Sequence, residues 1–178
     1  MIETKNFVVN ELQLIDAANL FDLMSANSER FHRYFPKTLG QNLSESDSKD
    51  FIQRKQKENA GRLEFTWGIR DASNNKVMGL LILKELHWNN GVGEFAYCID
   101  EAYEGRGWIS QIVKETSRYA FESLKLKTLQ IIAHQSNKGS VRVAEKCGFK
   151  WQKVLKASHT PPGELPLDME LYELYYEG

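Results

Sequence analysis

One amphipathic helical stretch between two β-rich runs constrains the fold of this chain more than any other feature. Between residues 109 and 124 the apolar side chains recur at helical spacing. The flanking runs, at 92–100 and 128–133, are rich in residues that favour strands. Because a helix that connects two strands of one sheet leaves them parallel, this unit predicts a parallel strand pair.

The other elements place that pair inside a larger, otherwise antiparallel sheet. Asp16 is expected to cap a first helix, and Ser44 with Asp47 resembles a capping arrangement for a second. Strands are expected at 7–12, 63–70, 76–83, 149–155 and 167–176, and helices at 17–24, 44–59 and 140–146. The second helix has few apolar residues, so we expect it on the surface. The sequence thus predicts an α/β (or α+β) fold with a mixed, mostly antiparallel sheet flanked by helices. No linker or repeat divides residues 1–178, so we expect a single domain.

Charge and composition exclude several classes of function. Lys and Arg number 23 against 24 Asp and Glu, which argues against a nucleic-acid partner. The longest apolar run, from Val77 to Leu83, is far shorter than the roughly 20 residues that span a bilayer, so no membrane association is expected. The N-terminal residues lack the pattern of a secretory signal, which predicts a cytoplasmic protein. Neither the two cysteines nor the four scattered histidines have metal-ligand spacing, so no metal is expected.

A glycine-containing loop lies between the strand at 92–100 and the helix at 109–124. It reads Tyr103-Glu104-Gly105-Arg106-Gly107-Trp108-Ile109. Its glycines permit a tight turn, and the helix start directs backbone N–H groups at an anion, with Arg106 as an added cation. Ser110 replaces the third glycine of a dinucleotide fingerprint, and Gly-Lys-Ser/Thr is absent. A phosphate loop of another kind and a glycine turn without ligand both remain open.

Two further segments carry a family resemblance. Asn137-Lys138-Gly139-Ser140, followed by Ala144-Glu145-Lys146-Cys147-Gly148-Phe149, resembles the second coenzyme A motif of the GNAT N-acetyltransferase superfamily, and the glycine loop resembles its pyrophosphate motif. Members of this superfamily transfer acetyl from acetyl-CoA to an amine. Gly93-Glu94-Phe95-Ala96-Tyr97 and Arg33-Tyr34-Phe35-Pro36 are similar to segments of its ribosomal-protein N-alpha-acetyltransferase (RimJ/RimL-like) branch.

The resemblance implies a GNAT fold whose central parallel strands splay apart, with acetyl-CoA as cosubstrate. Pantetheine would pair with main-chain groups of the first strand of that pair, as an added strand would. A homodimer is common in the branch. The implied coenzyme-binding residues are Tyr97, Cys98, Ile99, Gly105, Arg106, Gly107, Trp108, Ile109, Ser110, Asn137 and Ser140.

Two positions of the glycine loop differ from the superfamily. Glu104 stands where Gln or Arg is frequent, and Ile109 stands where Gly or Ala is frequent. A carboxylate next to a pyrophosphate repels it unless the side chain is turned outward. The departures at Glu104 and Ile109 therefore bear on the affinity of the loop for the coenzyme more than on the fold.

The chemistry of acetyl transfer assigns roles to Glu94 and Ser140. The amine must lose a proton, which Glu94 could accept through water, and the departing sulfur could take a hydrogen bond from Ser140. Glu94 could instead be a solvated surface group, and Ser140 and Asn137 could be helix caps. Cys98 is expected to be a packed residue. No Cys/His or Ser/His/Asp pattern suggests a covalent intermediate, which favours direct attack in a ternary complex.

The acceptor is less well specified. It is expected to be a primary amine, either a protein N-terminal alpha-amine or a small molecule. Four aromatic residues could line its pocket, although aromatics at this density are more often core: Phe31, Tyr34, Phe35 and Trp88. The alternative function is a non-catalytic acetyl-CoA- or CoA-binding sensor or interaction module on the same fold.

Overall fold

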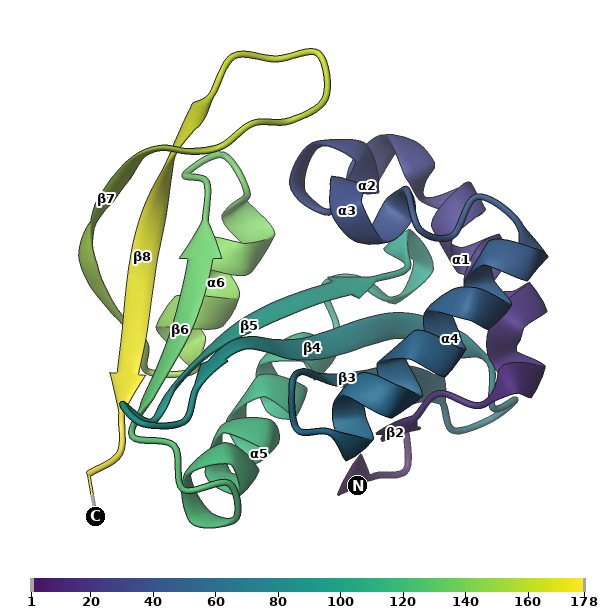
Figure 1. The fold of residues 1–178 in the computed structure, drawn as a ribbon, viewed down its shortest axis with the longest axis horizontal. Helices are drawn as coiled ribbons and strands as arrows, with labels where there is room; N and C mark the ends of the chain where they lie inside the picture. Colours follow the sequence, from purple (N-terminus) through teal and green to yellow (C-terminus); the bar gives the residue numbers. More distant parts are fainter. Residues whose placement is uncertain (1, 178) are drawn as a thin grey trace. The chain divides into compact units, whose positions relative to one another are not determined.

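The computed structural model describes residues 2–177, so Met1 and Gly178, the ends of the predicted domain, lie outside it. Across these residues eight strands form one sheet in the order β1-β2-β3-β4-β5-β6-β8-β7 (Figure 1). The strands are β1 (Ile2–Glu3), β2 (Phe7–Glu11), β3 (Phe65–Asp71), β4 (Val77–His87), β5 (Val92–Ile99), β6 (Thr128–Ala133), β7 (Lys150–His159) and β8 (Leu167–Tyr175). The helices are η1 (Leu14–Asp16), α1 (Ala17–Ala26), α2 (Ser28–Tyr34), α3 (Pro36–Leu39), α4 (Glu45–Ala60), η2 (Glu101–Tyr103), α5 (Trp108–Glu122) and α6 (Lys138–Lys146).

The mixed sheet confirms the predicted fold class. β5 and β6 pair in parallel, from Val92 opposite Thr128 to Phe95 opposite Ile131, with α5 as the connection between them. The pairs β1–β2, β2–β3, β6–β8 and β7–β8 are antiparallel. The strand–helix–strand pattern of the sequence therefore located the parallel pair correctly.

The chain divides into two compact units, one made of residues 1–82 and 97–106 and the other of 83–96 and 107–178. In the first unit, α1 packs against α4, and an apolar cluster fills the space beneath them. Phe51 and Ile52 of α4 are fully buried in this cluster. The helix expected on the surface is thus covered on one side, because its two apolar side chains lie on the face that meets the core.

Two features of the first unit differ from the sequence prediction. The short helices α2 and α3 were not predicted, although Pro36 at the first position of α3 is a recognised start signal. Asp16 precedes α1, as expected, but its side chain caps no N–H of that helix. The carboxylate instead accepts a hydrogen bond from the Gln13 N–H at 2.6 Å and forms a buried ion pair with Arg70, also at 2.6 Å.

The second unit is organised around β6 and α5. The buried side chains of α5 recur at the three- and four-residue spacing of one helix face, as the sequence pattern predicts. β8 lies between β6 and β7, so the last two strands form the expected antiparallel pair with the later strand on the inside (Figure 1). β7 is mostly exposed, and its pairing with β8 is irregular near Lys153 and Leu155.

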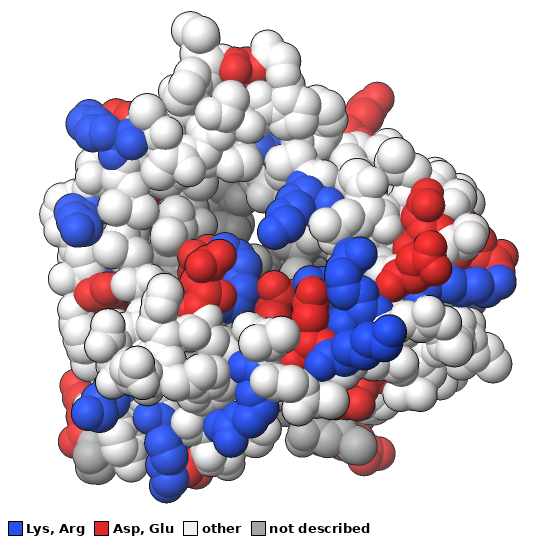
Figure 2. Space-filling view, viewed as in Figure 1, with Lys and Arg blue, Asp and Glu red and all other residues white. Residues whose placement is uncertain are grey.

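Charges of both signs are interspersed on the face shown in Figure 2, in keeping with the balanced composition. On α4, for example, Lys49 pairs with Glu45 and Lys55 with Glu58. Within residues 2–177, none of the helices combines the length and apolar character needed to cross a bilayer.

Candidate functional site

The backbone of the glycine loop has the conformation that an anion-binding turn requires. Gly105 and Gly107 have φ values of +73° and +76°, in the left-handed region that favours glycine. A Cβ atom at either position would meet no atom within 4 Å, so both glycines border open space. Gly107 is the N-cap of α5, and no side chain caps the helix there. Gly107 has no side chain that could accept a hydrogen bond from the first N–H groups of α5, which have no acceptor within the helix.

Side chains of the loop interact with one another and with β3. The Arg106 guanidinium donates a hydrogen bond to the Ala102 carbonyl at 2.9 Å, and its carbon lies 5.0 Å from the centre of the Tyr103 ring. The Tyr103 hydroxyl donates to the Asp71 carboxylate at 2.8 Å. Hydrogen bonds from Ser73 and Tyr103 lower the pKa of Asp71, and the bond to Asp71 raises the pKa of Tyr103. Arg106, expected as a cation for the anion, thus also stabilises the loop's own shape.

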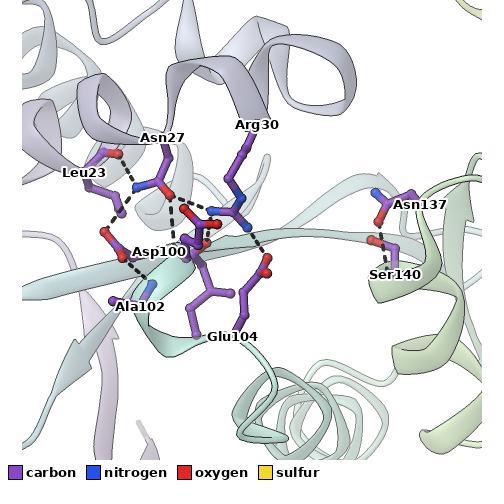
Figure 3. A network of polar contacts seen from close by, with 10 residues as sticks. Leu23, Asn27, Arg30, Asp100, Ala102, Glu104, Asn137 and Ser140 are labelled. Atoms are coloured by element: carbon purple, nitrogen blue, oxygen red, sulfur yellow. Dashed lines mark hydrogen bonds and ion pairs between the residues drawn. The ribbon is translucent and has the colours of Figure 1, made fainter.

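Glu104 is paired with a residue that the sequence analysis did not single out (Figure 3). Its carboxylate forms an ion pair with the guanidinium of Arg30 in α2. The Asn27 side-chain oxygen accepts a hydrogen bond from Arg30 at 2.5 Å, and the Ile99 carbonyl accepts a second at 3.5 Å. The Asn27 amide donates to Asp100 at 3.1 Å. No motif in the sequence links Arg30 to Glu104, since 74 positions separate them.

Glu94, the predicted base, lies on β5 and pairs with Lys84 of β4. Its carboxylate is 2.6 Å from the Lys84 ammonium, and the two side chains are 13% and 31% exposed. The burial of β5 does not follow one alternation, because the buried residues Phe95 and Cys98 are three positions apart. Glu94 and Cys98, which a strict alternation along the strand would place on the same face, therefore differ in exposure.

Cys98 is buried, as expected, and its thiol is not suited to act as a nucleophile. Burial raises the pKa of Cys98 to about 12, so the reactive thiolate form is very rare at neutral pH. Tyr97 and Ile99, its neighbours in β5, are partly exposed. All three residues follow the stretch of β5 that pairs with β6.

The second motif forms the start of α6. Asn137 is its N-cap, and the side-chain oxygen accepts a hydrogen bond from the Ser140 N–H at 3.2 Å (Figure 3). The cap is thus Asn137, whereas Ser140 lies inside the first turn and is not the capping residue. At the other end of α6, the Cys147 thiol donates to the Ser110 carbonyl in the first turn of α5 at 3.3 Å. Burial raises the pKa of Cys147 to about 11.

The predicted acceptor residues fall into two groups. Phe31 and Phe35 belong to or pack against the apolar cluster of the first unit, with ring centres 6.1 Å apart. Tyr34 ends α2 and lies beside Arg33. Trp88 is in the second unit, in the turn after β4, and is 38% exposed. A role for these aromatic residues in binding the acceptor stays a prediction, and Phe31 already has a packing role.

No cluster of three or more His, Cys, Asp or Glu side chains that could hold a metal ion occurs within residues 2–177. The polar groups present are of another kind. They comprise backbone donors at a left-handed glycine turn, a strand carboxylate and a hydroxyl in the first turn of a helix. Such groups can bind an anionic ligand and accept or donate a proton.

Comparison with known families identifies the protein family to which the chain belongs. The model of the acetyltransferase (GNAT) domain matches residues 7–150, which include the glycine loop, Glu94 and the whole second motif. The chain belongs to the GNAT acetyltransferase family. A relative from Bacillus subtilis (strain 168), described as "Probable N-acetyltransferase YjcK", is 27% identical over 150 residues, which cover 84% of this chain and 83% of the relative.

Solved structures show the same fold. The ribosomal-protein-S5-alanine acetyltransferase from Vibrio fischeri superposes with a TM-score of 0.91 at 18% identity, covering 99% of this chain and 96% of that one. The microcin C7 self-immunity acetyltransferase MccE, in complex with acetyl-CoA and AMP, has a TM-score of 0.86 at 19% identity, covering 97% and 94%. The resemblance to the GNAT superfamily is thereby confirmed, and a structure named for a ribosomal-protein acetyltransferase shares the fold.

Proposed function

We propose that this acetyltransferase moves the acetyl group of acetyl-CoA directly to a primary amine in a ternary complex, as one domain over residues 1–178. The observation that carries the proposal is the left-handed turn at Gly105 and Gly107, which leads into α5 without a side-chain cap. Such a helix start suits the pyrophosphate of the coenzyme, because its N–H groups and dipole favour an anion. Residues 105–110 would supply these contacts.

Two proton-transfer roles follow from the same proposal. Glu94 accepts a proton from the attacking ammonium, through water, and its ion pair with Lys84 holds the carboxylate in position. Ser140 donates a hydrogen bond to the departing sulfur and shares in its protonation, and the proton comes from the attacking nitrogen as the amide forms. A backbone N–H near Tyr97–Ile99 stabilises the oxyanion on the former carbonyl oxygen. Asn137 contacts the pantetheine amide in addition to capping α6.

Direct attack is supported by the state of the cysteines. An acetyl-enzyme formed on cysteine requires an accessible thiolate, and the high pKa values of Cys98 and Cys147 oppose one. We therefore expect initial-rate lines that intersect when both substrates are varied. Parallel lines, the signature of a covalent intermediate, would contradict direct transfer.

The acceptor we propose first is the alpha-amine of a protein. The ribosomal-protein-S5-alanine acetyltransferase that shares this fold is named for an alanine of a ribosomal protein. A peptide beginning with alanine and a set of polyamines and amino acids would be compared, with release of free CoA as the signal. If the protein acetylates a small amine faster than the peptide, the proposed acetyl transfer still holds, and the proposed acceptor is replaced by that amine.

Replacement of Glu94 by Gln separates catalysis from coenzyme binding. Loss of a general base lowers turnover by about 100-fold or more, whereas the affinity for acetyl-CoA stays the same. Turnover and the acetyl-CoA dissociation constant would be measured by free-thiol release and by calorimetry. Glu64→Gln is the matched control, because Glu64 also pairs with a lysine, Lys55, at 2.6 Å.

Three outcomes are informative. Equal loss of turnover in both variants would assign Glu94 a structural role. Wild-type protein that binds acetyl-CoA without acetylating any amine would support the non-catalytic sensor instead. Wild-type protein that does not bind acetyl-CoA at millimolar concentration would refute the proposed function.

A further inference from the structure

We propose that Arg30 of α2 makes the acidic start of the glycine loop compatible with a diphosphate, and so sets the affinity for acetyl-CoA. The inference rests on the proposed function, since it assumes that residues 105–110 bind the pyrophosphate. Arg30 is a positioning and charge-neutralising residue here, and it touches neither the amine nor the thioester. Its partner, Glu104, directly precedes Gly105.

The charge of Glu104 is the reason that a partner is needed. A free carboxylate at this place would repel a pyrophosphate bound to the next residues of the loop. Its ion pair with Arg30 cancels this charge and holds the carboxylate in one direction (Figure 3). Arg106 is the other cation nearby, but its guanidinium donates to Ala102 and lies over the Tyr103 ring.

Arg30 is held in place from the interior of the first unit. Asn27 is only 4% exposed. Its side-chain amide donates hydrogen bonds to the Leu23 carbonyl and the Asp100 carboxylate, and its oxygen accepts hydrogen bonds from the Glu101 N–H and the Arg30 guanidinium. Asp100 in turn accepts a hydrogen bond from the Ala102 N–H at 2.8 Å, which caps η2. Arg30 is therefore fixed relative to the same turn that carries Glu104, rather than being a mobile surface side chain.

A stabilising role alone does not explain this pair. The two side chains are 30% and 53% exposed, and ion pairs of such exposure contribute little to the free energy of unfolding. What the pair changes is the charge at the start of the loop. Its effect should therefore appear in binding of a diphosphate and not in thermal stability.

A double-mutant cycle tests this by calorimetric titration with acetyl-CoA. Arg30→Met should weaken binding by about tenfold, because it leaves the Glu104 charge unpaired next to the diphosphate. Glu104→Gln alone should bind as well as the wild type or better. The double variant, Arg30→Met with Glu104→Gln, should regain an affinity within about threefold of the wild type, since no uncompensated carboxylate is left.

Two further readouts separate charge from structure. The ratio of affinities between wild type and Arg30→Met should shrink in high salt, since counterions screen an exposed charge. With S-acetylpantetheine, which has no diphosphate, the two proteins should have the same kcat/KM. Arg118→Met, which removes the exposed Arg118–Glu115 pair on α5, is the matched control and should change neither quantity.

The inference fails if Arg30→Met binds acetyl-CoA like the wild type, or if the double variant binds as weakly as Arg30→Met. A weak double variant would mean that Arg30 only supports the fold of the loop, which melting temperatures of all four proteins would then show. Wild-type protein that does not bind acetyl-CoA would overturn the proposed function itself. If the wild type binds acetyl-CoA and Arg30→Met binds it with the same affinity, only this inference is overturned.

Discussion

Two helices of the second unit, α5 and α6, begin in opposite ways. α5 starts at Gly107, in a left-handed conformation and without a side-chain cap. α6 starts at Asn137, whose side chain accepts a hydrogen bond from the third residue of the helix. Both starts belong to segments that resemble family motifs. They differ in the group that accepts hydrogen bonds from the first backbone N–H groups of the helix.

This difference indicates which helix start can bind a ligand. A helix start leaves four backbone N–H groups without an intrahelical acceptor, and an anion or a side chain can satisfy them. At α6 the side chain of the N-cap residue, Asn137, takes one of these places, whereas the N-cap residue of α5, Gly107, has no side chain to do so. We therefore expect α5 to depend on its backbone conformation for binding, and α6 to depend on its cap for stability.

The largest effect is expected from Gly107→Val. The branched side chain disfavours a φ of +76° and would project into the space where the coenzyme approaches, so binding of acetyl-CoA should fall by more than 100-fold. Gly163→Val is the matched control, because Gly163 has a φ of +74° and equally open surroundings. Calorimetry with acetyl-CoA and melting temperatures would be measured for both.

Equal affinity in Gly107→Val and wild type would remove the loop from the coenzyme site. A similar loss in Gly163→Val would show that strain in the backbone, and not its position in the loop, is responsible. Both variants should lose a similar, small amount of thermal stability, since a Cβ meets no atom at either site.

A smaller effect is expected from Asn137→Ala. Loss of an N-cap costs about 1 kcal/mol, which corresponds to a fall of about 2–4 °C in melting temperature for a chain of this size. Ser44→Ala removes a comparable cap, from α4, where the hydroxyl accepts a hydrogen bond from the Asp47 N–H at 3.1 Å. If Asn137 also contacts pantetheine, only Asn137→Ala should weaken acetyl-CoA binding. Unchanged affinity in both variants would limit Asn137 to capping.

The smallest effect concerns pH. The turn before α5 is tied to Asp71 through Tyr103, and the pKa of Asp71 is lowered from its ordinary value of 3.8. A lowered pKa means that the carboxylate stabilises the folded state above pH 3.8, and that this contribution is lost as the pH falls through the folded-state value. The small gap in melting temperature between wild type and Asp71→Asn should therefore narrow as the pH falls below 3.8.

The Asn137→Ala gap should stay constant over the same pH range, because an amide does not titrate there. A constant gap for Asp71→Asn would show that its carboxylate does not contribute to stability. Thermal unfolding followed by tryptophan fluorescence measures both variants under the same conditions.

Local patterns in the sequence predicted much of the architecture. The strand at 128–133 was predicted with its observed bounds, and the amphipathic pattern located α5 because one face of that helix is buried along its length. Ser44 marked the start of α4, since capping is a contact between neighbours in the chain. The glycine loop and the family motifs could be recognised because each is a continuous segment.

Contacts between distant segments were not predictable in the same way. The position of β8 between β6 and β7 depends on pairing between strands that are far apart in the chain, and no local pattern records this. The buried pair of Arg70 with Asp16 spans 54 positions, which explains why Asp16 could be interpreted as a simple cap. α2 and α3 are short and rely on the apolar cluster below them.

The sequence by itself determined the α/β class, the parallel strand pair and the glycine turn before α5. These follow from periodicity, capping and backbone preference, which act over a few neighbouring residues. Only the tertiary structure decided that Glu104 is paired with Arg30 and that Lys84 holds Glu94. Such charge pairs depend on distances in space between side chains that lie apart in the sequence, and the folded backbone fixes these distances.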